Sequence, residues 1–361
     1  MARDVIVVGG GLSGLLAARE LSLAGMRVTL VEREQTGCES SWAGGGILSP
    51  LYPWRYPQAV TALAGWSQSY YPQAMAQLAA DTGLDPQYLP SGLLMLDPQE
   101  REQALLWGRA HGVQIQTVTI DGELFTEPAL HYRGDALFMP GVGQVRNPRL
   151  LQALVRDLEQ RGVEIRTQAP VAAIDIDKGV VTGVVVQGEH WAAPRVVVAC
   201  GAWSRRVLEP LGLSIHVEPV RGQMLLFKAG PGLIQHIVMR RGYYAIPRKD
   251  GHVLVGSTLE YAGFDKSTTE EARQTLVSEI GGLFPDLLEY PLVKQWAGLR
   301  PGSRDGVPII GEHPGVRGLF VSTGHFRNGV VLGPASARLL ADMMLGRSPI
   351  VAPEPYAPDR V

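Results

Sequence analysis

A glycine-rich turn near the C-terminal end carries side chains that could do chemistry. The turn, GHFRNG (324–329), follows LFVST and precedes VVLGPASARLLADMM, and this context predicts a strand, a tight turn and a helix. Turns of this kind usually hold small or solvated residues, yet Arg327 stands here beside a histidine, a phenylalanine and an asparagine. A buried guanidinium without an anion is costly. Arg327 therefore needs either a protein carboxylate or an anionic ligand, and a carboxylate ligand would match its fork of donors.

Two further side chains could contribute to such an anion site. Arg300, in WAGLRPGS (296–303), has the same two interpretations and is our first choice for direct contact with a carboxylate. Tyr244 follows Tyr243 in an expected strand, so the two side chains should point to opposite faces. The pattern YAIPRK favours Tyr244 as the one that faces a pocket. No residue pattern predicts an activated nucleophile or a metal cluster.

The most informative segment is DVIVVGGGLSGLLAARELSLAGMRVTLVERE (4–34). Its VIVV run predicts a buried parallel strand, and Gly9, Gly11 and Gly14 form the pattern G-x-G-x-x-G that opens a helix. Gly9 permits the tight turn, Gly11 lets the backbone approach a pyrophosphate, and Gly14 lets helix and strand pack closely. The helix start stabilises phosphates, and Glu32, at the end of the second strand, is placed to bind a ribose hydroxyl. These features predict a dinucleotide site without deciding between NAD and FAD.

The elements that must position these residues are spread along the whole chain. RNPRLLQALVRDLEQRGVEI (146–165) predicts a helix with Asn147 as N-cap, followed by a strand. PVAAIDI and VVTGVVVQG predict a hairpin or meander, and RVVVACGAWS (195–204) returns as a buried strand. The cofactor domain is thus interrupted and completed only at the C-terminal turn. A nicotinamide dehydrogenase usually keeps this domain contiguous, so the interruption favours a flavin.

Composition narrows the class of protein. A chain of 361 residues can hold two domains, and 33 basic against 35 acidic residues, a net charge of −2 without a basic stripe, disfavour nucleic-acid binding. Cys38 and Cys200 are the only cysteines, which excludes a disulfide framework. No signal-peptide pattern and no apolar stretch near the roughly 18 residues of a membrane span are present, so we expect no membrane association and a cytoplasmic location.

Several motifs together carry a family resemblance over essentially the whole chain. They are VVGGGLSG with Glu32, ESSWAGGGILSP (39–50), VVVACGAWS, PVRGQ (219–223), YAIPRKDGHVLVGST (244–258), WAGLRPGSRDGVPIIG (296–311) and GHFRNG. With them the chain resembles the D-amino-acid oxidase (DAO) superfamily of FAD-dependent oxidoreductases, and most closely its glycine oxidase branch, which is associated with thiamine biosynthesis.

The resemblance implies a fold and a division of the chain. It implies an α/β fold with a Rossmann-like FAD-binding domain of the GR2/DAO type and an interleaved α+β substrate domain built on an antiparallel sheet. The expected FAD-binding segments are 1–85, 145–215 and 295–361, and the expected substrate-domain segments are 86–144 and 216–294. A homotetramer is suggested only by the family.

The resemblance also assigns roles to residues. Arg300 and Arg327 would hold a substrate carboxylate, with Tyr244 as a hydroxyl donor. FAD would be bound non-covalently, because the sarcosine oxidases attach their flavin to a C-terminal cysteine and no cysteine follows Cys200 here. The fingerprint and the resemblance together place at the cofactor Gly9, Gly11, Leu12, Ser13, Gly14, Glu32, Arg33, Ser40, Ser41, Gly45, Gly46, Ile47, Val171, His325, Phe326, Arg327, Asn328, Gly329, Val330 and Val331.

The chemistry implied is oxidation of a small amino acid, glycine first. The Cα hydrogen passes to flavin N5 as a hydride, O2 takes the electrons to give H2O2, and the imine is hydrolysed to glyoxylate or handed to thiazole synthase. No catalytic acid or base is required, so His325 is expected to stack or to support the backbone. Alternatives are a sarcosine or D-amino-acid oxidase, a dehydrogenase with another electron acceptor, a flavin domain in tRNA modification, and a non-catalytic ligand-binding protein. The loop 44–57, with Tyr52, Trp54 and Tyr56, has two interpretations, a mobile lid or a packed segment.

Overall fold

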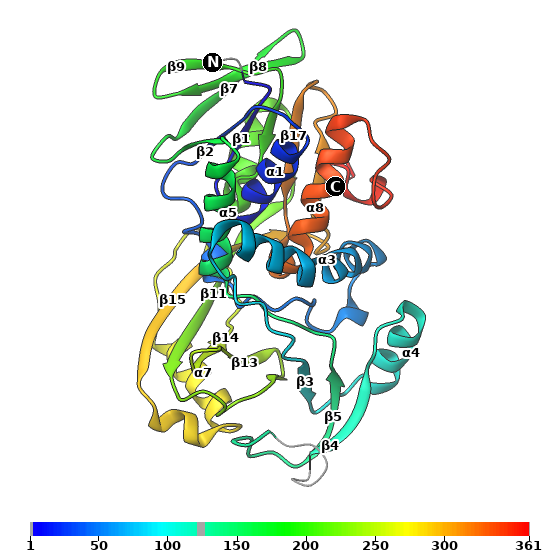
Figure 1. Ribbon diagram of the computed structural model, residues 1–361, viewed down its shortest axis with the longest axis vertical. Coiled ribbons are helices and arrows are strands. Elements are labelled where there is room, and N and C mark those ends of the chain that lie inside the picture. The colour runs from blue at the N-terminus through cyan, green and yellow to red at the C-terminus, as the bar shows by residue number, and fades with distance from the viewer. Residues whose placement is uncertain (1–2, 121–126, 361) are drawn as a thin grey trace.

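The computed structural model describes residues 3–120 and 127–360, which form two lobes along the long axis of the molecule (Figure 1). One lobe contains the strands β1 (Val5–Val8), β2 (Val28–Val31), β6 (Glu164–Arg166), β10 (Val196–Val198), β16 (Ile309–Glu312) and β17 (Leu319–Thr323). The other contains β3 (Leu93–Leu96), β4 (Gln116–Ile120), β5 (Gly134–Met139), β11 (Val217–Lys228), β12 (Ile237–Arg240), β13 (Tyr243–Pro247), β14 (His252–Gly256) and β15 (Leu292–Ser303). A small sheet is formed by β7 (Val171–Asp177), β8 (Val180–Val186) and β9 (Glu189–Ala192).

The helices among the described residues are distributed over both lobes. They are α1 (Leu12–Leu23), α2 (Ser40–Ala43), α3 (Gln58–Thr82), α4 (Arg101–His111), α5 (Asn147–Gln160), α6 (Ser204–Leu208), α7 (Glu270–Gly281) and α8 (Gly329–Leu345). None of them is long and apolar enough for a membrane span.

The first lobe is a Rossmann-like unit. Its six-stranded sheet has the order β16-β17-β10-β1-β2-β6 and is parallel except for β16. All four residues of β1 are buried, because both faces of the sheet are covered. Val5 and Val7 pack with α1, α3, α5 and α8, whereas Ile6 and Val8 pack with the three-stranded sheet β7-β8-β9. The carboxyl ends of β1, β10 and β17 meet at one edge, where parallel sheets bind ligands.

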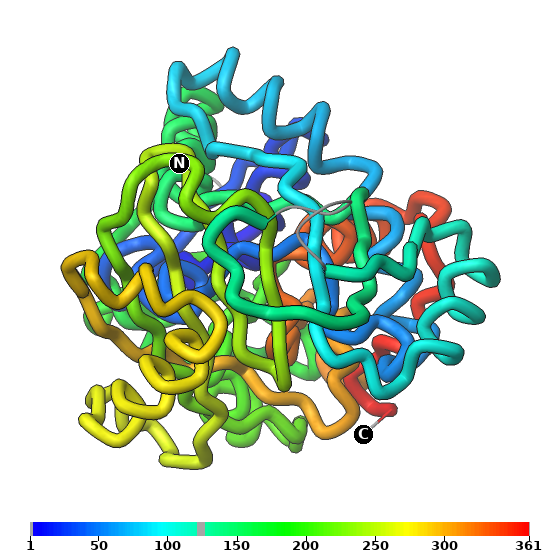
Figure 2. The backbone as a smooth tube through the Cα atoms, turned by 90° about the horizontal axis from the view of Figure 1, so that it is seen from below, coloured from blue at the N-terminus to red at the C-terminus, as the bar shows by residue number. Residues whose placement is uncertain are grey.

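The second lobe is a mostly antiparallel sheet. Its eight strands have the order β15-β11-β14-β13-β12-β3-β5-β4. Seen from below, segments 93–120 and 217–256 lie side by side, because β12 pairs with β3 (Figure 2). Tyr243 packs on the face covered by α7, and Tyr244 packs on the opposite face, so their predicted alternation is confirmed. The long strands β11 and β15 run between the two lobes (Figure 1). The predicted combination of a Rossmann-like unit with an antiparallel sheet is confirmed.

Local predictions were right for most elements and wrong for one helix cap. The hairpin β7–β8 and the strand, turn and helix around 319–345 are present as predicted. Asn147, however, is the first residue of α5 rather than its N-cap, which is Arg146. Its side chain instead joins distant segments, because Nδ2 donates to the carbonyl oxygen of Ser41 at 2.8 Å.

The loop 44–57 is a packed segment. Trp54 is buried and its Nε1 donates to Glu100, while its ring meets that of Tyr52 at 5.9 Å between centroids. The Tyr52 hydroxyl accepts a hydrogen bond from the amide of Gly242 at 3.1 Å. These contacts fit the packed interpretation of the aromatic residues.

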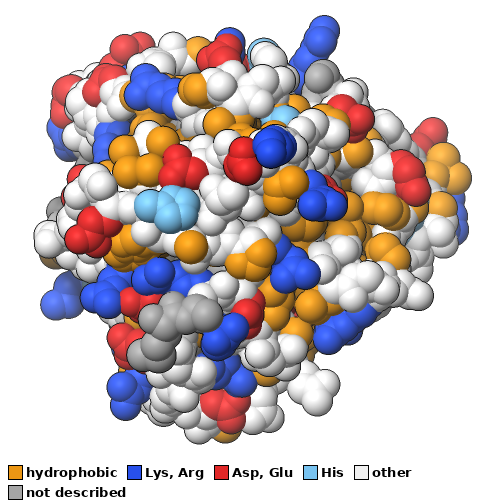
Figure 3. All heavy atoms as spheres, turned by 90° about the horizontal axis from the view of Figure 1, so that it is seen from above, with side chains coloured by type: hydrophobic (Ala, Val, Ile, Leu, Met, Phe, Trp, Pro, Cys, Tyr) orange, Lys and Arg blue, Asp and Glu red, His pale blue; other side chains and the backbone are white. Residues whose placement is uncertain are grey.

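Charges are mixed on the surface. In the view from above, acidic and basic side chains alternate with hydrophobic ones (Figure 3). This pattern matches the small net charge of −2 and gives that face no extended field of one sign.

Candidate active site

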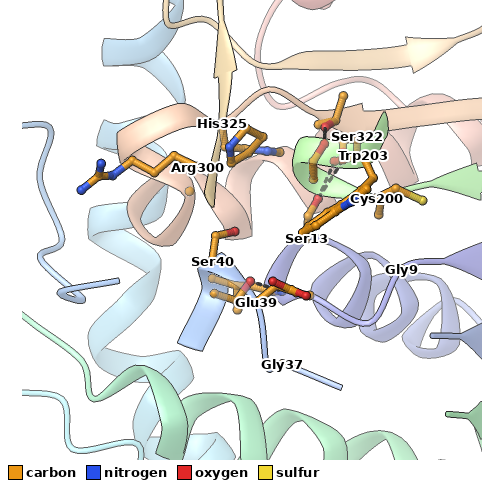
Figure 4. A pocket seen from close by; sticks show the side chains of 18 of the residues that line it. Gly9, Ser13, Gly37, Glu39, Ser40, Cys200, Trp203, Arg300, Ser322 and His325 are labelled. Atoms are coloured by element: carbon orange, nitrogen blue, oxygen red, sulfur yellow. Dashed lines mark hydrogen bonds between the residues drawn. The ribbon is translucent and has the colours of Figure 1, made fainter. Parts of the chain in front are cut away.

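A cavity of about 530 Å³ opens at the carboxyl edge of the parallel sheet and extends to the antiparallel one. Figure 4 shows Gly9 and Arg300 on opposite sides of it, with Ser13, Cys200 and Trp203 nearer to Gly9. The predicted site residues that line it are Gly9, Gly11, Leu12, Ser13, Glu32, Arg33, Ser40, Ser41, Gly45, Gly46, Ile47, Val171, Tyr244, Arg300, His325, Phe326, Arg327, Gly329 and Val330. Gly14, Asn328 and Val331 do not line it; Asn328 and Val331 are buried behind its wall.

The turn between β1 and α1 is shaped by its glycines. Gly9 has φ +110°, and a Cβ there would lie 2.5 Å from the carbonyl oxygen of Ala199. A Cβ on Gly14 would lie 1.9 Å from the carbonyl oxygen of Gly9, so the close packing of helix on strand excludes any side chain. A Cβ on Gly11 would lie 3.2 Å from Ser41 Oγ. The cradle a dinucleotide needs is therefore present, and larger residues would fill it.

Side chains from neighbouring loops fix this turn. Glu32 Oε2 accepts from the Gly10 amide at 2.6 Å, so its carboxylate braces the turn from the end of β2. Ser41 Oγ accepts from the Leu12 amide at 2.8 Å. Ser13 Oγ lies 2.8 Å from Ser322 Oγ, which joins α1 to the end of β17 (Figure 4). The positive end of α1 thus faces the cavity from a rigid setting, which suits a pyrophosphate.

The same side of the cavity contains residues that the sequence did not single out. Trp203, just after β10, packs against Arg33, whose guanidinium carbon lies 3.9 Å from the indole centroid. Arg33 also pairs with Glu39 at 3.0 Å. The signal for Trp203 was present in VVVACGAWS, a motif quoted only as a family marker. Cys200 lines the cavity too, and burial raises the pKa of its thiol to about 12, so it stays protonated and unreactive.

Another wall of the cavity is formed by the loop 44–47, and the half-buried Arg248 binds this loop from the side away from the cavity. Arg248 Nη2 donates to the Gly45 carbonyl at 2.8 Å, and its Nη1 donates to the Val145 carbonyl at 3.1 Å and to Gln144 Oε1 at 2.7 Å. A Cβ on Gly46 would lie 2.1 Å from the Val145 carbonyl oxygen. Burial, followed by the charge of Arg146, lowers the pKa of Arg248 to about 10, so its charge persists at neutral pH. This arginine therefore fixes the shape of the loop.

The far end of the cavity gathers the three predicted anion-binding side chains. Arg300 donates to Ser257 Oγ at 2.7 Å, to the Thr258 carbonyl at 3.1 Å and, more weakly, to the Arg221 carbonyl at 3.4 Å. Tyr244 is 6 % exposed and points into the same space. Within residues 3–120 and 127–360, neither Arg300 nor Arg327 forms an ion pair with a carboxylate. An internal salt bridge, the alternative left open by the sequence, is therefore not present in this part of the chain.

The electrostatics of this end favour an anion. Burial lowers the pKa of Arg300, and the nearby positive charge of Arg327 lowers it further. Two guanidinium groups around one space repel each other unless an anion lies between them. The geometry thus fits a carboxylate ligand held by Arg300 and Arg327, with the Tyr244 hydroxyl within the same wall.

His325 is part of the wall rather than a poised base. Its ring is 4 % exposed, and burial lowers its pKa to about 4, so the imidazole is neutral at neutral pH. Its Nε2 has no hydrogen-bond partner among the described residues. The His325 backbone forms a bridge with Gly302, which ties the turn 324–329 to β15. This position fits the predicted role in backbone support.

The fold and the cavity define a class of enzyme. A glycine-rich phosphate cradle, a cavity that leads to a cationic end and a parallel sheet completed by the C-terminal strand are the features of a flavin-dependent oxidoreductase. The chain belongs to the family of FAD dependent oxidoreductases (DAO), whose model matches residues 4–343.

Individual relatives are similar to this chain over nearly all of its length. The chain is 50 % identical to a glycine oxidase of Pseudomonas aeruginosa over 99 % of both chains. It superposes on the crystal structure of glycine oxidase from Geobacillus kaustophilus with a TM-score of 0.94 and 31 % identity, covering 100 % of this chain and 99 % of that one. A bifunctional protein ThiO/ThiG of Trichormus variabilis is 30 % identical over 96 % of this chain and 53 % of its own length.

The half-buried Arg248 yields a prediction about cofactor binding. Replacing it by Met leaves three oxygen acceptors behind the loop 44–47 without their donor, which should cost about 2 kcal/mol of unfolding free energy and weaken FAD binding roughly tenfold. Denaturation of the apoprotein and titration with FAD measure the two effects. The exposed Arg149 on α5, replaced by Met, is the matched control and should change neither quantity. An unchanged FAD affinity in the Arg248 variant would remove its role at the loop.

Proposed function

We propose that this chain oxidises glycine, and also sarcosine or small D-amino acids, to the imine and then the 2-oxo acid. The observation that carries the proposal is the pair Arg300 and Arg327 at the end of the cavity, without carboxylate partners in the described part of the chain. Similarity to glycine oxidases along the whole chain supports the same substrate class. This end of the cavity offers two guanidinium groups and a tyrosine hydroxyl, which are the groups that would bind the carboxylate of a small amino acid.

The residues of this chain would act by binding and orientation. When bound, FAD accepts the Cα hydrogen of the substrate as a hydride and passes the electrons to O2, giving H2O2. Arg300 and Arg327 hold the substrate carboxylate, and the Tyr244 hydroxyl adds a donor, so the Cα–H bond has a fixed direction. The buried wall around His325 limits the access of water. Water then hydrolyses the imine to glyoxylate and ammonia, and no catalytic acid or base of the protein is needed.

We also propose the cofactor contacts and the domain division. The cavity-lining residues of the predicted FAD set would bind FAD without a covalent bond, the phosphates at Leu12 and Ser13 and a ribose hydroxyl at Glu32. Segments 1–85, 145–215 and 295–361 would form the FAD-binding domain, and segments 86–144 and 216–294 the substrate domain. Limited proteolysis with and without FAD would test these boundaries.

Partners and location follow from the same proposal. The product imine would be handed to thiazole synthase, and the match to about half of a bifunctional protein ThiO/ThiG supports such a link. We propose a cytoplasmic homotetramer that works without nucleic acid or membrane. Light scattering would measure the oligomeric state.

The experiment that tests the activity uses colour and peroxide. The purified protein with bound FAD should be yellow and should bleach on anaerobic addition of glycine. H2O2 should be released under air with glycine, and the rates with sarcosine and D-alanine rank the substrates. Bleaching without H2O2 release would instead support the alternative, a dehydrogenase with another electron acceptor. No bleaching with any of the three substrates would contradict the proposal.

The pH dependence provides a further prediction. Because the substrate amine must be neutral to release a hydride, kcat/KM for glycine should rise about tenfold per pH unit above neutrality, up to the pKa of the amine. His325 contributes nothing in this window, since its pKa of about 4 leaves it neutral throughout. Steady-state rates at saturating O2 across this range are the measurement. A flat profile would argue against hydride transfer without a base.

A further inference from the structure

The segment PVRGQ lies directly behind the anion-binding end of the cavity, on β11 opposite β15. Arg221 and Gly222 pair with Leu299 and Gly298, next to Arg300. The hydrogen-bond acceptors of the Arg300 guanidinium in the described chain are neutral: the Arg221 and Thr258 carbonyl groups and the Ser257 hydroxyl. Two carboxylates are nevertheless close by, those of Glu260 and Asp265, and both are bound to Arg221. Arg300, which has no carboxylate partner in the described chain, therefore lies next to Arg221, which has two.

The Arg221 side chain binds both carboxylates. Its Nη2 and Nε donate to Glu260 Oε2 at 2.6 and 2.9 Å, and its Nη1 donates to Asp265 Oδ2 at 2.5 Å. The other oxygen of Glu260 accepts from Gln223 Nε2 at 3.0 Å and from the Thr258 hydroxyl. The Arg221 side chain is only 9 % exposed and that of Glu260 is 26 % exposed, so this ion pair is largely shielded from water, whereas the Asp265 carboxylate is half exposed.

Glu260 stands close enough to compete for Arg300. The carbonyl oxygen of Arg221 accepts from the Glu260 amide at 2.9 Å and from Arg300 Nη1 at 3.4 Å. Arg300 also donates to the carbonyl of Thr258, two residues before Glu260. Removing one member of a buried ion pair leaves a charge that seeks a new partner. For a Glu260 carboxylate freed from Arg221, Arg300 is a nearby cation without a carboxylate partner among the described residues, and the two charges already interact.

Gly222 provides the space in which the Arg300 guanidinium lies. A Cβ at this position would stand 2.2 Å from both Nη1 and Nη2 of Arg300 and 2.3 Å from its central carbon. Any residue larger than glycine would displace the guanidinium from the cavity wall. PVRGQ thus affects Arg300 in two ways. Gly222 leaves space for its guanidinium, and Arg221 binds the two carboxylates that could otherwise pair with it.

We propose that Arg221 is a positioning residue for substrate binding: by holding Glu260 and Asp265, it keeps Arg300 available for the substrate carboxylate, while Gly222 leaves room for the Arg300 guanidinium. The inference rests on the proposed function, in which Arg300 binds that carboxylate. It explains why a chain that binds an anion at this end carries two acidic residues beside the anion site.

Acetate binding by the FAD-loaded enzyme, followed by the visible absorption of the cofactor, tests the proposal. Replacing Arg221 by Met should weaken acetate binding about tenfold or more, because Glu260 then pairs with Arg300. The double variant Arg221→Met with Glu260→Gln should return to within about threefold of the parent, because the amide has no charge to compete. Glu260→Gln alone should bind acetate like the parent.

Each result has a defined meaning. Unchanged binding in the Arg221 variant, or a double variant no better than the single one, would overturn the proposal, since simple structural damage is not repaired by a second substitution. If the parent did not bind acetate, or Arg300→Ala bound it equally well, the proposed function of Arg300 would fall and this inference with it. Those outcomes differ from one in which the parent binds acetate through Arg300 and the Arg221 variant binds it with the same affinity, which would overturn this inference alone.

Gly222→Ala is a second variant that remains informative if the Arg221 variant does not fold. It should weaken acetate binding about tenfold with FAD still bound, because the added methyl group displaces Arg300. Gly65→Ala, on α3, is the matched control, since a Cβ there meets nothing within 4 Å. Parental acetate affinity in Gly222→Ala would refute the role given to this glycine.

Discussion

Replacing Arg300 by Ala is expected to lower kcat/KM for glycine about a hundredfold, equal to ~3 kcal/mol or more of transition-state stabilisation. The reason is that Arg300 is the half-buried cation best placed to hold the substrate carboxylate, with three neutral acceptors that orient its guanidinium. Arg327 remains in the variant, but one guanidinium alone cannot fix the direction of the Cα–H bond. We expect kcat to fall together with kcat/KM, because orientation is lost as well as affinity.

The measurement is steady-state H2O2 release, with FAD content and thermal unfolding recorded for each variant. Arg304, which is exposed directly after β15, provides the matched control as Arg304→Ala, and it should keep the parental rate. FAD content should remain parental in both variants, since Arg300 lies at the end of the cavity opposite Gly9 (Figure 4). A parental kcat/KM in the Arg300 variant would remove this residue from carboxylate binding.

Gly14→Ala is expected to have the largest effect on the cofactor. The added Cβ would lie 1.9 Å from the Gly9 carbonyl oxygen, so α1 and the turn after β1 must move apart. Overpacking of this kind costs about 3 kcal/mol, which corresponds to roughly a hundredfold in FAD affinity if the cost falls on the bound state. The protein should therefore be purified largely without FAD, although Gly14 itself does not line the cavity.

Titration of the apoprotein with FAD, followed by flavin fluorescence, measures this effect. Gly65→Ala again is the control, because its Cβ meets nothing within 4 Å and alanine favours a helix. Parental FAD affinity in Gly14→Ala would show that the turn after β1 does not bind the pyrophosphate.

The sequence by itself determined the local units of this protein. The strand β1, the glycine-rich turn, α1 and β2 follow from contiguous residues, since a buried β-branched run, three glycines and an apolar helix face each act locally. The alternation of Tyr243 and Tyr244 follows from strand geometry alone. The family resemblance added the antiparallel sheet and the cofactor, because its motifs are spread along the whole chain.

Only the tertiary structure decided how distant segments meet. Asn147 binds the Ser41 carbonyl instead of capping its helix, and Trp203 packs on Arg33, because these pairs become neighbours only when the sheet is assembled. The sequence left Arg300 with two interpretations, an internal ion pair or a ligand clamp. In the folded chain Glu260 pairs with Arg221, and Arg300 binds neutral acceptors. Residue spacing could not predict this, because charge pairing depends on distances in space.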